Sequence, residues 1–157
     1  MKRRWYPAVA AGLFAADQAV KTGVSQNMDK GAEKKLAGKA VLRRVENRGL
    51  CLGLLSGSPA VVRGLSAAAS GIVTVLFGAA LAGRKGACRK AGYTMMAAGA
   101  WSNTFDRFAR GHVVDYIGFR AGAQKFAKIT YNLGDFFIAA GALLAALGSL
   151  WSGKSDG

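Results

Sequence analysis

The chain has 157 residues, of which 52% are hydrophobic, and its formal net charge is +14. The length fits one domain, but a mean hydropathy of +0.20 is too apolar for an ordinary soluble protein. The basic residues flank the apolar segments and lack the interleaved aromatic residues of a base-stacking surface. The composition therefore argues against nucleic acid as a partner and favours anionic membrane lipids.

Four apolar segments predict four membrane-spanning helices. These spans lie near 5–24, 62–83, 91–109 and 132–152. The clearest segment, 64–83, contains no charged residue and has the length that crosses the hydrocarbon layer as a helix. An even number of spans places both termini on one side of the membrane. A cleaved signal peptide is the alternative for the first segment, because three basic residues precede its alanine-rich run; the apolar character that resumes beyond Asp17 favours a helix that stays.

A long loop (25–61), a short basic turn (84–90) and a medium loop (110–131) join the spans. Residues 40–45 of the long loop are rich in β-branched and apolar side chains, which favours strands. We therefore expect an all-α membrane protein with a single domain over residues 1–157. Its fold would be a four-transmembrane-helix bundle with a small β platform on the membrane surface that carries the basic stretch 30–48. The basic residues on both faces do not decide which side of the membrane this is.

Glycine is frequent in the second and third spans. Gly71 and Gly78 lie two turns apart in the second, and Gly92 and Gly99 have the same spacing in the third. Small residues let membrane helices approach closely. We expect both pairs to mark helix contacts.

Half of the eight acidic residues lie in or beside a span, although charged groups are costly in lipid. Asp17 is near the end of the first span, Asp106 near the end of the third, and Asp135 near the start of the fourth. All three therefore approach the same face of the membrane. Asp115 and Asn47 fall in the loops on that face. The connectivity predicts a polar pocket at one membrane surface.

Helical spacing of three or four residues groups several polar side chains. Two groups share one side of the third and fourth spans respectively: Asn103, Asp106 and Arg107, and Asn132 and Asp135. Asp17 and Lys21 are also four residues apart, which lets an acid and a base neutralise each other within one helix. We interpret this last pair as structural.

Five segments resemble, in order, motifs of the lipoprotein signal peptidases (signal peptidase II). They are DQAVK at 17–21 (DQxxK in the family), NRGLCLG at 47–53 (NxGxAFG), GAWSNTFDR at 99–107 (GAxGNxxDR), VVDY at 113–116 (VVDF) and YNLGD at 131–135 (FNxAD). Cys51 and Leu52 stand where the family has Ala and Phe, Ser102 replaces a glycine, and Gly134 replaces an alanine. The loops are also unusually basic.

The resemblance implies a membrane aspartic endopeptidase of the bacterial cytoplasmic (inner) membrane. Such an enzyme removes the signal peptide of a prolipoprotein by cutting before its diacylglyceryl-cysteine. Its active site faces away from the cytoplasm and both termini are cytoplasmic, which would make the long loop 25–61 and its small β platform extracytoplasmic. The implied partners are prolipoproteins and membrane lipids, and the protein is expected to act as a monomer without a metal or another cofactor.

The resemblance also assigns roles to individual residues. Asp115 and Asp135 are the implied catalytic pair. The implied substrate-binding or supporting residues are Asn47, Gly49, Asn103, Asp106, Arg107 and Asn132. Two adjacent carboxyl groups, one ionised and one protonated, can activate a water molecule and protonate the leaving amine. Because two carboxylates that share a site cannot easily both ionise, the pKa of one is raised.

Two other functions fit parts of the sequence. A small transporter or ion pathway would use buried charged residues, but near mid-span rather than gathered toward one face. A thiol enzyme would use Cys51 and His112, which the predicted topology places on the same face. That topology places Cys88 on the opposite face from Cys51, so we expect no intramolecular disulfide. Two cysteines and one histidine also make a structural zinc site implausible.

Overall fold

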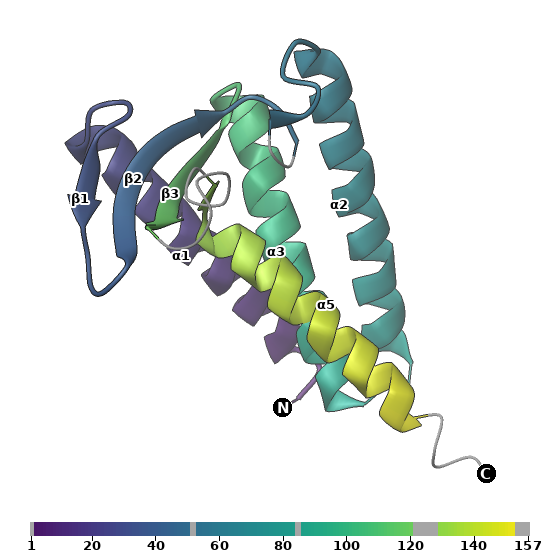
Figure 1. Cartoon of the computed structure of the whole chain (residues 1–157). Helices are drawn as coiled ribbons and strands as arrows, with labels where there is room; N and C mark the ends of the chain where they lie inside the picture. The colour runs from purple at the N-terminus through teal and green to yellow at the C-terminus, as the bar shows by residue number, and fades with distance from the viewer. Residues whose placement is uncertain (1, 51–52, 84–85, 121–128, 153–157) are drawn as a thin grey trace.

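A computed structural model of the chain describes residues 2–50, 53–83, 86–120 and 129–152. Within these residues the chain forms four long helices and a four-stranded sheet (Figure 1). The helices are α1 (Trp5–Asn27), α2 (Pro59–Ala82), α3 (Ala87–Ala109) and α5 (Leu133–Ser152). The four predicted helices are confirmed with shifted ends. The largest shift is in α3, which begins at Ala87, so the predicted turn 84–90 is too long and its Arg89 and Lys90 are helical.

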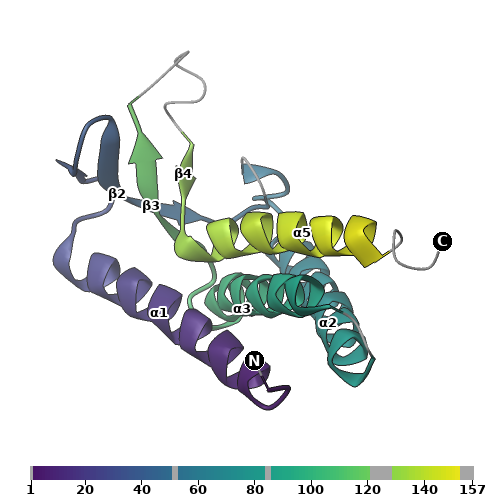
Figure 2. The same ribbon diagram turned by 90° about the horizontal axis from the view of Figure 1, so that it is seen from below.

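α3 is the central helix and packs against α1, α2 and α5 (Figure 2). Its contact with α5 is close because glycines face the neighbouring backbone. A Cβ atom on Gly92 would lie 2.5 Å from the Gly141 carbonyl oxygen, so only glycine permits this approach. The expected role of Gly71 and Gly78 in helix contact is wrong, because a Cβ at either position would meet nothing within 4 Å.

Two helices in the described part of the chain are long and apolar enough to cross a membrane. They are Pro59–Ala82 and Leu133–Leu150. Large apolar side chains of α2 point outward, and Ile72 and Val75 are 63% and 71% exposed. This exposure suits contact with lipid. α1 and α3 carry buried polar side chains and do not meet the same criterion, so the four-span topology stays a prediction for these two helices.

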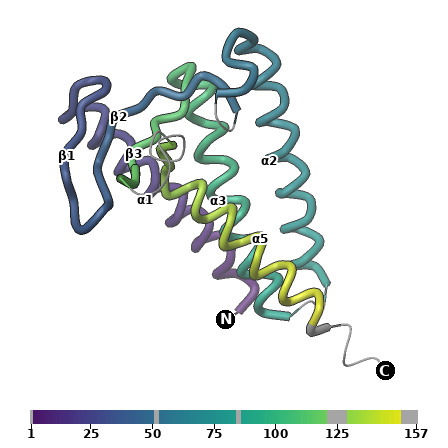
Figure 3. The backbone as a smooth tube through the Cα atoms, viewed as in Figure 1, coloured from purple at the N-terminus to yellow at the C-terminus, as the bar shows by residue number. Residues whose placement is uncertain are grey.

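The start of α1 and the end of α5 lie at the same end of the molecule, opposite the sheet (Figures 1 and 3). This arrangement matches the up-and-down connectivity expected for an even number of spans. The side of the membrane on which that end lies stays a prediction.

The sheet is antiparallel in the order β1-β2-β3-β4. Its strands are β1 (Glu33–Lys35), β2 (Ala40–Asn47), β3 (Val113–Phe119) and β4 (Thr130–Tyr131). The strand predicted at 40–45 is confirmed and extends to Asn47. The prediction that 110–131 is simply a loop is wrong, because β3 and β4 come from it. β3 is buried along most of its length, which its run of β-branched and aromatic residues favours.

The sheet is anchored on the end of α1 by a small apolar core. Val24 of α1 and Met28, the residue after the helix, pack against Val114 and Tyr116 of β3, and all four side chains are buried. This packing fixes the height of β3 beside the helices. Asp115 therefore lies on a strand whose position is fixed by packing against the end of α1, and not on the loop that the sequence predicted.

The basic stretch 30–48 covers β1 and β2. Part of its charge is neutralised internally, because Glu46 lies 2.7 Å from Lys30 and 3.2 Å from Arg44. Glu33 likewise pairs with Arg43 at 2.5 Å. Hydrogen bonds from Arg120 and then from Arg43 lower the pKa of Glu33, and the hydrogen bond from Lys30 lowers the pKa of Glu46. The ion pair between Glu33 and Arg43 joins β1 to β2, and the pair between Lys30 and Glu46 joins the segment before β1 to β2.

Candidate active site

Asn132, which lies between β4 and α5, donates hydrogen bonds to both Asp115 and Asp135. The Asn132 amide nitrogen donates to Oδ1 of Asp115 at 2.7 Å. The Asn132 backbone N–H donates to Oδ2 of Asp135 at 3.0 Å, and the Asp135 backbone N–H donates back to Oδ1 of Asn132 at 3.0 Å. This reciprocal pattern is a helix cap. The prediction that Asn132 belongs to the fourth helix is corrected, because it precedes the first helical residue.

Asn47 completes the surroundings of Asp115 from the end of β2. Its amide nitrogen donates to Oδ2 of Asp115 at 3.2 Å, and its Oδ1 accepts the Gly49 N–H at 3.0 Å. Gly49 must be glycine, because a Cβ there would lie 2.5 Å from the backbone of Gly53. Arg107 donates to the Gly49 carbonyl at 3.0 Å. The structure thus brings Asn47, Gly49 and Arg107 together beside Asp115, while their expected substrate contacts stay predictions.

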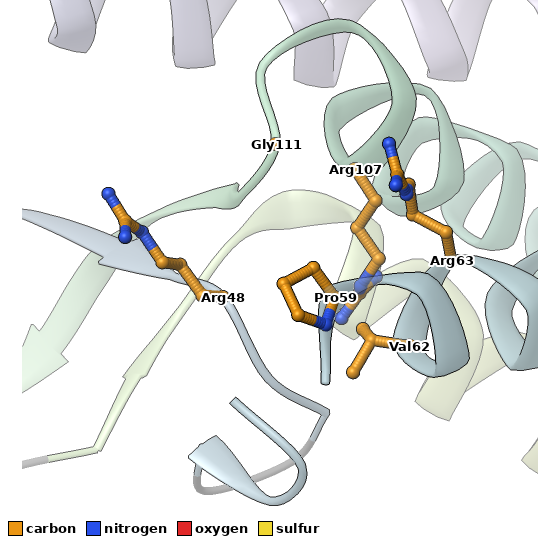
Figure 4. Close-up of a pocket in the computed structure, with 6 residues that line it drawn as sticks. All are labelled: Arg48, Pro59, Val62, Arg63, Arg107 and Gly111. Atoms are coloured by element: carbon orange, nitrogen blue, oxygen red, sulfur yellow. The ribbon is translucent and has the colours of Figure 1, made fainter. Parts of the chain in front are cut away.

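Arg107 also lines a small open hollow of about 80 Å³ at the start of α2. The other lining residues are Arg48, Pro59, Val62, Arg63 and Gly111 (Figure 4). The Arg107 side chain reaches toward Pro59, whereas that of Arg48 extends away from it. No acidic residue is among those described as lining this hollow. The surface beside the candidate site is therefore strongly positive.

A buried ion cluster lies behind the two aspartates. Nζ of Lys21 is 2.8 Å from Oδ2 of Asp17 and 3.0 Å from Oδ2 of Asp106, and all three side chains are fully buried. The predicted Asp17–Lys21 ion pair is confirmed as a contact, but Lys21 also neutralises Asp106. Arg110 pairs with Asp106 from the end of α3. These ion pairs connect α1 to α3. They also neutralise buried charges, each of which would be costly without a partner of opposite charge.

Asn103 connects this cluster to Asp135. Its Oδ1 accepts from Lys21 at 2.8 Å, and its Nδ2 donates to Oδ1 of Asp135 at 2.9 Å. Asp106 instead accepts a hydrogen bond from the backbone N–H of Val114 on β3 at 3.3 Å. Of the predicted site residues, Asn47, Asn103 and Asn132 bond directly to an aspartate of the pair. Asp17, Lys21 and Asp106 form the layer behind.

Sequence reasoning missed several members of this network. Gln18 bonds to Asp106 at 3.1 Å. Ser102 donates to Oδ2 of Asp17 at 2.5 Å, and Tyr116 donates to Oδ1 of the same carboxylate at 2.9 Å. The position of Ser102, four residues before Asp106, could have identified it. Tyr116 becomes visible only when 113–119 is read as a strand, since neighbouring side chains then point to opposite faces.

The environment of Asp115 changes its protonation. Burial, followed by the charge of Asp135, raises the pKa of Asp115 to about 7, against opposing hydrogen bonds from Asn132 and Asn47. Burial, followed by the charge of Asp17, raises the pKa of the Tyr116 hydroxyl. Near neutral pH, Asp115 therefore exists in both protonation states, and the Tyr116 hydroxyl stays protonated and able to donate.

The thiol alternative, which needs Cys51 beside His112, is not tested by the described part of the chain. Cys51 lies outside the described residues. Nε2 of His112 lies 3.9 Å from Oε1 of Glu46, at the edge of the sheet. Cys88 is an exposed free thiol in the first turn of α3.

Comparisons with known proteins agree with this architecture. Residues 9–151 match the family described as Signal peptidase (SPase) II. The lipoprotein signal peptidase of Nostoc sp. is 34% identical over 151 residues, which cover 95% of this chain and 91% of that protein. That of Burkholderia cenocepacia is 32% identical over 130 residues, or 82% of this chain and 76% of that protein. A solved bacterial membrane enzyme has a TM-score of 0.81 at 19% identity, covering 97% of this chain and 91% of its own, so the two share a fold.

The fold and these matches define the class as a membrane protease. Within that class, the chain belongs to the signal peptidase II family.

Proposed function

We propose that this chain is an aspartic endopeptidase that removes the signal peptide of prolipoproteins, cutting before the lipid-modified cysteine. Membership of the signal peptidase II family supports the substrate class. The aspartic mechanism rests on one observation: Asn132 donates hydrogen bonds to both Asp115 and Asp135, from its side chain and its backbone respectively. Two carboxyl groups that hydrogen-bond to one helix-cap residue are held close together and are suited to act on the same peptide bond.

The two carboxyl groups have different environments, which suggests different roles. Asp135 accepts hydrogen bonds from Asn103 and from the Asn132 backbone, and it lies in the first turn of α5, where the helix dipole favours an anion. Asp115 is the buried partner whose pKa is about 7, so it can hold a proton at neutral pH. We assign Asp135 as the general base and Asp115 as the general acid.

The proposed reaction follows from these states. Asp135 takes a proton from a water molecule while the water oxygen forms a bond to the scissile carbonyl carbon. Asp115 gives its proton to the carbonyl oxygen, which forms a neutral tetrahedral intermediate. When the C–N bond breaks, the amine nitrogen takes the proton from Asp135, and the hydroxyl proton returns to Asp115 as the new carboxyl group forms. Both aspartates end in their starting states, and the mechanism uses no metal or organic cofactor.

The proposed topology places this site at the extracytoplasmic surface of the bacterial inner membrane. Both termini would be cytoplasmic, and the monomer would cross the membrane four times. The apolar outer face of α2 lets lipid chains of the substrate stay in the bilayer while its peptide bond approaches Asp115 and Asp135. The positive hollow beside Arg107 suits anionic lipid headgroups at the same level.

The direct test is incubation of the purified full chain with a diacylglyceryl-modified prolipoprotein. The expected product is the apolipoprotein that begins at the modified cysteine, identified by mass spectrometry. A matched substrate whose cysteine is replaced by serine tests the requirement for the lipid. Absence of cleavage by a folded wild-type protein would contradict the proposal and leave the transporter alternative as the stronger function.

A further inference from the structure

We propose that Ser102, Tyr116 and Gly134 form a matched unit around the carboxylate of Asp17, and that the Tyr116 hydroxyl is a positioning residue for the Asp115–Asp135 pair. We call these four residues the Asp17 unit. The positioning role rests on the proposed function, whereas the matching of the four residues does not.

Both oxygens of the Asp17 carboxylate are held from outside its own helix. Ser102 of α3 donates to Oδ2 at 2.5 Å, and Tyr116 of β3 donates to Oδ1 at 2.9 Å. Lys21 adds the ion pair at 2.8 Å from Oδ2. The side chain of Asp17 is fully buried, so no exchange with solvent replaces these partners. The carboxylate is therefore fixed in one orientation.

Gly134 leaves the space that this orientation needs. A Cβ atom on Gly134 would lie 3.0 Å from Oδ2 of Asp17 and 2.9 Å from Oδ1 of Asn132. Both distances are tighter than an ordinary contact between a methyl group and an oxygen. A methyl group at residue 134 therefore fits only if the Asp17 carboxylate and the Asn132 side chain both move. The hydrogen bonds from Ser102 and Tyr116, together with the Lys21 ion pair, oppose the movement of Asp17.

Ser102, Tyr116 and Gly134 all differ from the residues that the family motifs have at these positions. The chain has GAWSN where the motif reads GAxGN, VVDY where it reads VVDF, and YNLGD where it reads FNxAD. Two of these changes add a hydroxyl group that donates to Asp17, and the third removes the methyl group that would meet it. Changes that surround one carboxylate and fit one another sterically are expected to depend on one another.

The Tyr116 hydroxyl links this unit to the candidate site. While it donates to Asp17, it accepts the backbone N–H of Leu133 at 3.0 Å. Leu133 is the first residue of α5 and follows Asn132, whose side chain and backbone hold the two aspartates. Tyr116 also neighbours Asp115 on β3. The Tyr116 hydroxyl group therefore adds a link between β3 and the start of α5, beside the hydrogen bond from Asn132 to Asp115.

The matching is tested by the cost of Gly134→Ala in two backgrounds. In the wild-type background the added methyl group is expected to lower the melting temperature in detergent by roughly 5 °C, as for overpacking of a fixed core. In a Ser102→Ala, Tyr116→Phe background the same change is expected to cause a smaller loss, because Asp17 can then rotate away and only the close contact with Asn132 remains. Gly12→Ala is the matched control, since a Cβ there meets nothing within 4 Å. An equal loss in both backgrounds would overturn the matched unit.

The positioning role is tested by Tyr116→Phe alone, with cleavage measured on the lipidated substrate. We expect kcat to fall by roughly tenfold and KM to stay within about twofold, because the hydroxyl orients reacting groups without touching the substrate. Tyr93→Phe, in the first half of α3, is the control for the same atom change. An unchanged kcat, or a loss confined to KM, would overturn the positioning role.

The two experiments separate this inference from the proposed function. Failure of the wild-type protein to cleave would contradict the peptidase assignment and, with it, the positioning role. The melting measurements need no substrate and would still decide whether Ser102, Tyr116 and Gly134 are matched around Asp17.

Discussion

Replacing Asp115 by Asn should abolish cleavage and yet stabilise the protein above neutral pH. The folded protein holds the pKa of this carboxyl at about 7, compared with an ordinary value of 3.8. Between these values the folded state binds a proton that the unfolded state releases, so wild-type stability falls as the pH rises from about 4 to about 7. At 1.36 kcal/mol per pKa unit, the full loss is about 4 kcal/mol. The Asp115→Asn variant cannot ionise and escapes this loss.

The variant also loses a hydrogen bond. Asn47 and Asn132 both point amide donors at Asp115, whereas an asparagine side chain has only one accepting oxygen. One donor then faces another donor, at a cost of about 1–2 kcal/mol. The net expectation is a variant about 1–2 kcal/mol less stable than wild type below about pH 4, roughly equal to it near pH 5, and about 2–3 kcal/mol more stable at pH 8.5. The two stability curves should therefore cross.

Thermal unfolding in detergent at several pH values measures this crossing. Each kcal/mol corresponds to roughly 2–4 °C for a protein of this size. Asp29→Asn is the control, because Asp29 is exposed. Cleavage by Asp115→Asn should fall at least about 10²-fold at every pH, as for loss of a general acid. A variant that is destabilised equally at pH 5 and pH 8.5 would refute the buried-acid reasoning, and one that retains substantial turnover would refute the catalytic assignment.

Three further predictions concern the aspartate pair, the buried ion cluster and the membrane topology. Asp135→Asn should abolish cleavage, and its combination with Asp115→Asn should be no worse than either change alone, because residues that act as a unit are not additive; a further loss in the double variant would contradict a shared mechanism. Lys21→Met should destabilise the protein by about 3–5 kcal/mol, measured by thermal unfolding, since it leaves two buried carboxylates without their shared cation; a melting temperature equal to that of wild type would contradict this. Cys88 should react with a membrane-impermeant thiol reagent only from the cytoplasmic side, and labelling from outside would contradict the topology.

The sequence alone predicted the helices and the gathering of polar residues, because both follow from local patterns. A helix that crosses lipid needs about 20 apolar residues, and α2 and α5 show this directly. Connectivity then placed the acidic ends of three helices at one face. The resemblance in five ordered motifs supplied Asp115 and Asp135 as the candidate pair, and the family assignment is confirmed.

Tertiary structure alone decided how these residues are connected. The spacing of Asp17 and Lys21 predicted an ion pair within one helix, but Asp106, 85 positions beyond Lys21, shares the same ammonium group. The strand register of β3 directs Tyr116 toward Asp17, which no local pattern along residues 110–131 encodes. The physical reason is that hydrogen bonds and ion pairs of buried groups depend on which elements pack together, and packing is a property of the whole chain.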